Sequence, residues 1–153
     1  MLKKLIDFYN RRISGFNERS LTFDDLVREC NRSGITILTL KLRRARGGAL
    51  WANEDPYLIL SSSLSEPDLI ITGFHELYHL QCNPPGAEIL FSDGNLSDLR
   101  SAEQQANAVG LVALMPDFEV VRMSVDRIKN YYGIGRELAQ RRHDILWRKV
   151  NSL

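Results

Sequence analysis

One segment of the 153-residue chain constrains its fold more than any other, the stretch SEPDLIITGFHELYHLQC that runs from Ser65 to Cys82. Ser65 is a suitable N-cap, Pro67 fits the first turn of a helix, and Asp68 places a negative charge near the positive end of the helix dipole. Half of the residues that follow, from Leu69 to Cys82, are leucine, isoleucine, phenylalanine or tyrosine. The segment therefore predicts a helix in the core of the protein, against which the rest of the chain must pack.

Two of the three histidines in the chain, His75 and His79, lie four residues apart in this predicted helix, and Glu76 follows the first. Residues four apart share one helical face, with Cβ atoms roughly 5–6 Å apart, so both imidazoles can reach one zinc ion. Glu76 lies about 100° further round the helix, where its carboxylate can take a proton from water on the metal. The competing interpretation is a chance pairing, which would leave two unpaired histidines in a core helix.

A catalytic zinc ion needs a third protein ligand and an open coordination position. Glu103 is the best candidate, because it lies on the face of a later predicted helix that is otherwise apolar and small. Small residues on that face would let the two helices approach closely. The other members of the face are Leu99, Ala106, Gly110 and Ala113. The alternative for Glu103 is a surface position on a helix whose boundaries differ slightly from those predicted.

Three nearby residues have lesser predicted roles. Asn107, one turn after Glu103, could hold a metal ligand in place by a hydrogen bond. Cys82 shares the helical face of the histidines but lies about 10.5 Å from His75 along the helix, so we expect a small buried hydrophobe instead of a ligand. Because Cys82 and Pro85 occupy the positions of the last glycine and histidine in the metzincin pattern, that class is excluded.

The whole pattern predicts one α+β domain over residues 1–153, because no linker, repeat or low-complexity segment divides the chain. Glycine and proline positions predict turns at Gly47–Gly48 and Asn53–Pro56. Together the strands suggest a small, mainly antiparallel meander packed on a helical core. Helices are predicted near residues 2–9, 23–34, 65–83, 97–115, 124–133 and 136–150, with Ser97 as a cap, and strands at residues 35–40 and 57–60.

Charge and composition exclude several classes of partner. A formal net charge of +1 gives no global signal for nucleic acid or an anionic membrane. The N-terminus lacks the apolar run of a secretory signal, and no segment approaches the ~18 apolar residues of a membrane span. The two cysteines form no motif, so we expect a cytoplasmic protein. Two basic clusters are expected to be solvated: Arg43, Arg44 and Arg46, and the pair Arg141 and Arg142.

Three segments together resemble the ImmA/IrrE family of metallopeptidases: LILSSSL, FHELYHL and EQQANAVGLVALMP. That family has a strand, an H-E-x-x-H helix, and an E-x-[EQ]-A-N motif that runs into L-M-P. The resemblance covers roughly Ile35 to Pro116. It implies a gluzincin-like fold in which His75, His79 and Glu103 bind zinc, or alternatively manganese, and Glu76 is the general base.

The resemblance also implies a function. Relatives typically relieve repression by cleaving a helix-turn-helix repressor, in mobile elements or stress responses, so we expect a zinc-dependent endopeptidase that meets such a repressor in trans. The alternative is a non-catalytic, metal-binding regulator that binds a repressor or antitoxin; direct DNA binding is a third possibility with little support. Tyr78 stands where the family usually has glycine, and is expected to narrow or reshape the cleft. The strand Tyr57–Leu60 is a hypothetical docking edge for an extended substrate.

Overall fold

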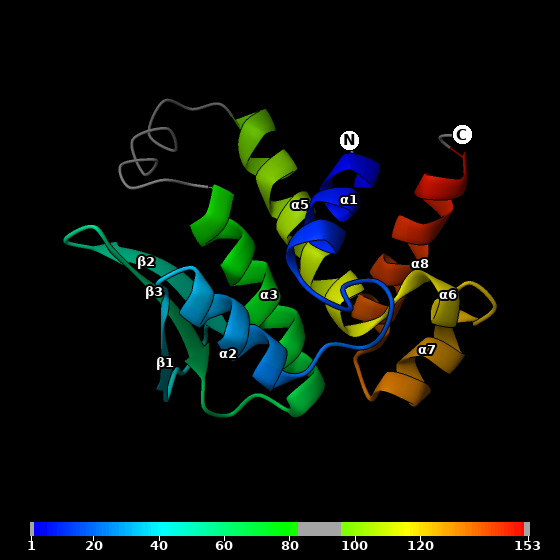
Figure 1. The fold of residues 1–153 in the computed structure, drawn as a ribbon. Coiled ribbons are helices and arrows are strands. Elements are labelled where there is room, and N and C mark those ends of the chain that lie inside the picture. The colour runs from blue at the N-terminus through cyan, green and yellow to red at the C-terminus, as the bar shows by residue number, and fades with distance from the viewer. Residues whose placement is uncertain (1, 83–95, 152–153) are drawn as a thin grey trace.

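The computed structural model describes residues 2–82 and 96–151 of the chain and has the predicted α+β architecture (Figure 1). A small sheet lies on one side of a group of helices. The elements are α1 (Leu2–Arg12), α2 (Phe23–Arg32), β1 (Thr36–Leu40), β2 (Gly47–Ala52), β3 (Asp55–Ser61), α3 (Glu66–Cys82), α5 (Leu96–Leu114), α6 (Asp117–Val120), α7 (Val125–Tyr132) and α8 (Arg136–Asn151). None of the described helices is both long enough and apolar enough to cross a membrane.

The sheet is mixed, which corrects the expected antiparallel meander. Its order is β1-β3-β2, with β1 parallel to β3 and β2 antiparallel to β3. Leu58 and Leu60 of β3 are fully buried, whereas most of β1 is exposed. The most buried strand, β3, therefore lies in the centre of the sheet. The chain forms β1 on one side of β3 and then crosses to the other side to form β2.

Glycines 47 and 48 begin β2 and do not form the predicted turn. Gly47 is required for a different reason, because a Cβ there would lie 2.7 Å from the backbone oxygen of Ile59. The second predicted turn is present at the β2–β3 connection. Its central residues, Asn53 and Glu54, have φ values of 50° and 70°, as in the left-handed two-residue turns that match the twist of a hairpin.

The helix ends follow the capping residues in the sequence. Thr22 and Asp25 form a capping box at the start of α2. The Ser65 hydroxyl accepts a hydrogen bond from the Asp68 backbone N–H at 3.4 Å. Ser97 is not a cap, because α5 already begins at Leu96. The predicted end of α3 at the prolines after position 83 lies outside the described residues, and the single-turn α6 was not predicted.

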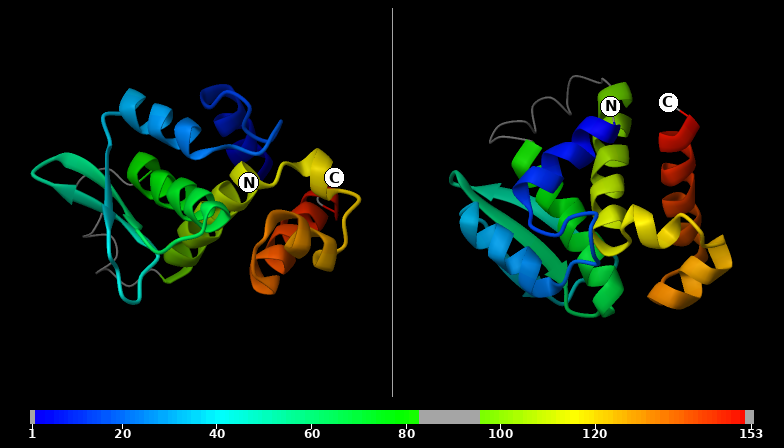
Figure 2. Two further views of the ribbon diagram at one scale, coloured as in Figure 1. Left: turned by 90° about the horizontal axis from the view of Figure 1, so that it is seen from below. Right: turned by 45° about the vertical axis from the view of Figure 1, so that its right-hand side comes forward.

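Helix α3 occupies the centre of the molecule (Figure 2). One side packs on β2 and β3, and the other packs on α5, while α6, α7 and α8 lie beyond α5. Ile70, Phe74 and Leu77 of α3 are almost completely buried, which confirms the predicted core helix. Because this core packing fixes the rotation of α3, it also fixes the directions in which the side chains between these apolar positions point.

A buried polar network fixes the C-terminal half of α3 against α1 and α2. Gln81 donates a hydrogen bond to Glu29 and accepts one from the Tyr9 hydroxyl, both at 2.9 Å. Glu29 is 4% exposed and forms ion pairs with Arg12 and Arg32 at 2.7 and 2.6 Å. Because each buried polar group in this network has partners, its burial does not incur the full desolvation cost.

Arg142 is completely buried, which corrects the prediction of a solvated basic pair. Its Nε donates to the backbone oxygen of Met115 at 2.8 Å, and its Nη2 donates to Asp117 at 2.6 Å. Arg141 is exposed and pairs with Glu137. Successive helical residues differ by about 100° in direction, so one arginine of the pair faces the end of α5 while the other faces solvent. The other predicted cluster, Arg43, Arg44 and Arg46, is exposed.

Candidate metal centre

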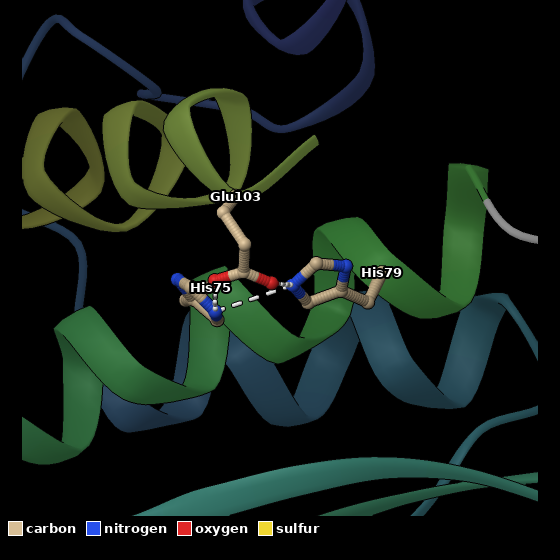
Figure 3. Close-up of side chains that lie close together, drawn as sticks. All are labelled: His75, His79 and Glu103. Atoms are coloured by element: carbon tan, nitrogen blue, oxygen red, sulfur yellow. Dashed lines mark hydrogen bonds and ion pairs between the residues drawn. The ribbon is translucent and has the colours of Figure 1, made fainter. Parts of the chain in front are cut away.

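Two helices contribute the predicted metal ligands. His75 and His79 project from α3 toward α5, and Glu103 projects from α5 toward them (Figure 3). The two histidine Nε2 atoms lie 3.2 Å apart. Oε1 of Glu103 lies 2.9 Å from Nε2 of His79, and Oε2 lies 3.5 Å from Nε2 of His75. One donor atom from each of the three side chains lies within 4.8 Å of the other two.

The donor set fits a tetrahedral zinc ion. Zinc bonds of about 2.0–2.2 Å at tetrahedral angles place neighbouring donor atoms roughly 3.3 Å apart. The separation of 3.2 Å between the two histidine nitrogens is close to that value. The two oxygens of Glu103 lie at similar distances, Oε1 at 2.9 Å from His79 and Oε2 at 3.5 Å from His75. Two imidazole nitrogens and one carboxylate are also the donor types of a catalytic His₂Glu site, which leaves a fourth position open. His75, His79 and Glu103 could therefore hold a metal ion, and their assignment as its ligands stays a prediction.

The small face of α5 explains how Glu103 reaches the histidines. Ala106 and Ala113 are completely buried, and Gly110 lies directly against α3. A Cβ at position 110 would lie 2.3 Å from the backbone oxygen of Ile71. Any larger residue would separate the helices, so this face is small because the helices meet there. The Leu99 side chain, also predicted on this face, lies outside the described part of the chain.

The environment of His75 favours the neutral imidazole that binds metal. Burial is the main cause that lowers its pKa, and the neighbouring His79 acts in the same direction. Glu103 and a side-chain hydrogen bond with Asn107 oppose that shift. Asn107 therefore lies close to the His75 ring, where the sequence predicted a supporting residue.

Glu76 lies beside the three donor atoms and not among them. Its Oε1 is 4.0 Å from Nε2 of His75, and its side chain is 14% exposed. Burial, followed by repulsion from Glu103, raises the pKa of Glu76 to about 7. A Cβ at Gly47 would lie 3.5 Å from Cγ of Glu76. The carboxylate therefore lies between α3 and the start of β2, which the sequence did not indicate.

Tyr78, which was expected to narrow or reshape the cleft, lies in the core between α3 and α5. Its ring is buried, and its hydroxyl donates to Oε1 of Gln105 at 2.6 Å. This hydrogen bond joins α3 to α5 close to the site: Tyr78 directly precedes His79, and Gln105 lies two residues after Glu103. Cys82 is exposed and free, so the expectation that it is buried is wrong. Cys82 is the last residue of α3, and its side chain is not covered by the packed core.

Comparison with known proteins agrees with this geometry. A family model described as the IrrE N-terminal-like domain, peptidase family M78, matches residues 30–143, which include both motifs. The chain belongs to the IrrE N-terminal-like peptidase family. Membership supports a metallopeptidase role, because peptidases of this family are typically metal-dependent. It also agrees with the resemblance seen in the sequence.

A solved structure described as a "Mycobacterium tuberculosis transcriptional regulator" is similar in fold to this member of the IrrE N-terminal-like family, with a TM-score of 0.58 and 16% sequence identity. The similarity covers 92% of this chain and 51% of the other, so the chain spans about half the length of that regulator. Comparison with functionally curated proteins gives no significant match. The likeness to the mycobacterial structure supports the fold alone.

Proposed function

We propose that this chain is a zinc-dependent endopeptidase that cleaves a specific regulatory protein. One observation carries the proposal: the donor atoms of His75, His79 and Glu103 converge beside a buried Glu76. A zinc ion, or manganese in its place, supplies Lewis acidity when bound, which acidifies water and polarises a carbonyl group. The remaining chemistry is proton transfer, for which Glu76 is the best placed residue.

Glu76 has the properties of a general base and acid near neutral pH. A group is most effective in this role when its pKa lies near the working pH, and burial raises the pKa of Glu76 to about 7. In its ionised form the carboxylate would accept a proton from water. It would later return the proton to the amine that leaves. The Glu76 side chain lies against Gly47 at the start of β2, with its carboxylate 4.0 Å from His75.

The edge strand β2 is the proposed docking site for an extended substrate segment. The hypothesis that gave this role to Tyr57–Leu60 is wrong, because β3 is paired on both sides. Among the strands of the described residues, β2 pairs with β3 alone, and its first residue, Gly47, adjoins Glu76. A segment that paired with the outer edge of β2 would therefore pass beside Glu76 and the histidines.

The proposed substrate is a helix-turn-helix repressor met in trans in the cytoplasm, so that cleavage relieves repression. The proposal draws on membership of the IrrE N-terminal-like peptidase family. The near-neutral charge of the chain also favours a protein partner over direct contact with nucleic acid.

The test is to incubate the zinc-loaded protein with a repressor encoded beside its gene and to follow the repressor by intact mass spectrometry. We expect two fragments whose masses add to that of the repressor plus one water. The fragments should be absent with Glu76→Gln and with a chelator. A stable complex in which the repressor remains intact would refute the endopeptidase and favour the non-catalytic regulator.

A further inference from the structure

A cavity of about 330 Å³ lies between α5 and α8, which run antiparallel to each other on the C-terminal side of the molecule (Figure 1). Leu111 and Ile145 supply its apolar surface. Gln104 and Asn107 of α5 add two amide groups, and Arg141 and Arg148 of α8 add two guanidinium groups. This α5–α8 groove is formed by side chains from two long helices, so its shape is fixed by their packing.

The groove adjoins the candidate metal centre through α5. Gln104 follows Glu103 directly, and Asn107 both lines the groove and influences the pKa of His75. Glu103 and Asn107 differ in direction by about 40° around the helix axis, and Glu103 and Gln104 by about 100°. The groove therefore lies on the face of α5 next to the face that carries Glu103.

The groove offers more hydrogen-bond donors than acceptors. Arg148 forms no hydrogen bond or ion pair with another described residue. Arg141 pairs with Glu137, but that pair is exposed and therefore weak. Asp144, an acidic residue of the lining, already accepts a hydrogen bond from Gln140 at 2.9 Å. The Asn107 amide also lines the groove, and its N–H groups are donors that a ligand could use.

We propose that the α5–α8 groove binds the carboxylate of an aspartate or glutamate side chain close to the scissile bond of the protein substrate. A carboxylate can accept hydrogen bonds from the guanidinium of Arg148 and from the Asn107 amide, and such charge-assisted bonds are among the stronger ones in proteins. The methylene groups of the same side chain would lie on Leu111 and Ile145. The inference rests on the proposed peptidase function and adds a specificity for acidic residues.

The first experiment measures binding without any cleavage. N-acetyl-glutamate amide is titrated into the ¹⁵N-labelled, zinc-loaded protein, beside the neutral isostere N-acetyl-glutamine amide. We expect saturable shifts in the signals of Gln104, Asn107 and Ile145, with a Kd at least about tenfold lower for the acid. Arg148→Gln should remove this preference, whereas Arg127→Gln, an exposed arginine on α7, should retain it. Equal affinities, no shifts, or shifts confined to the metal centre would overturn the proposal.

The second experiment separates a substrate side chain from a free small acid. A mixture of peptides from a proteome digest is incubated with the zinc-loaded protein, and the cleaved bonds are mapped by mass spectrometry. We expect aspartate and glutamate to be enriched at one position near the cut, and Arg148→Gln to reduce that enrichment. Cleavage without enrichment would overturn the groove while leaving the peptidase intact. Binding in the groove without cleavage would overturn its assignment to a substrate.

Discussion

Gly110 on α5 lies so close to Ile71 on α3 that a Cβ at position 110 would approach the Ile71 backbone oxygen to 2.3 Å. The same Cβ would lie 3.4 Å from the backbone nitrogen of His75. This contact sets the distance between the two helices two turns from Glu103. The geometry of the candidate metal centre therefore depends on the absence of one side chain.

Gly110→Ala should weaken both the fold and the metal site. Backbone cannot move aside as a flexible side chain can, so α5 must shift, at a cost of about 1–3 kcal/mol. Urea denaturation and zinc competition with a chromogenic chelator would measure the two effects. Gly48→Ala is the matched control, because nothing lies within 4 Å of a Cβ there. Zinc affinity unchanged in Gly110→Ala would contradict the role given to this contact.

Purified protein should contain about one zinc ion per chain, bound by three side chains. His79→Ala and Glu103→Ala should each lose it, since two remaining ligands are too few for a stable site. Elemental analysis by mass spectrometry, with circular dichroism to confirm folding, measures this directly. Full zinc content in Glu103→Ala would show that the exposed carboxylate, 54% accessible, is not a ligand.

Glu76→Gln should keep the metal and lose the activity. The amide has nearly the same shape but cannot accept a proton, and general base catalysis typically contributes about 10²–10⁴ in rate. The expected result is a fall of at least about a hundredfold in the rate of repressor cleavage at unchanged zinc content. Retained cleavage would refute the role assigned to Glu76.

Tyr78→Phe should destabilise the protein by about 1–2 kcal/mol, because it removes the hydrogen bond between α3 and α5 and leaves the ring in place. We expect a lower urea midpoint and weaker zinc binding, since the bond lies next to both His79 and Glu103. Tyr131→Phe is the control, as Tyr131 is 65% exposed. If the two variants behave alike, the Tyr78–Gln105 bond does not support the site.

The raised pKa of Glu76 predicts a pH dependence of stability in the metal-free protein. The folded state holds a proton up to about pH 7, whereas the unfolded chain releases it near the ordinary value of 4.5. The free energy of unfolding should therefore fall as pH rises through this window, by on the order of 3 kcal/mol, and then level off. The difference between Glu76→Gln and the unaltered protein, from urea denaturation with chelator present, should grow across the same window. A constant difference would show that Glu76 has an ordinary pKa.

Local patterns in the sequence were sufficient for most helices and for the grouping of the three donor side chains. Ser65, Thr22 and Ser124 act through neighbours within one turn, so their effect is visible in sequence. The link between His79 and Glu103 crosses 24 positions, yet it could be predicted because both lie on helical faces with unusual composition. The description of the three as metal ligands stays a prediction.

Long-range choices could not be predicted in this way. The parallel pairing of β1 with β3 skips a strand, and no local pattern distinguishes it from a meander. Arg142 looks like any surface arginine until Met115 and Asp117 are placed around it. From the sequence, Gly47 looks like a turn residue; its close packing against the Ile59 backbone and the Glu76 side chain is visible only in the structure. In each case the deciding partner lies far away along the chain.

The exposure of the three donor side chains differs in a way that bears on metal exchange. His75 and His79 are 17% and 14% exposed and are fixed on the core helix, whereas Glu103 is 54% exposed. An incoming cation can therefore meet the carboxylate at the surface and reach the imidazoles without any opening of the core. In the proposed zinc site, loading and loss of the ion would require only a rotation of the Glu103 side chain, and the concentration of free zinc around the protein would set the fraction of active molecules.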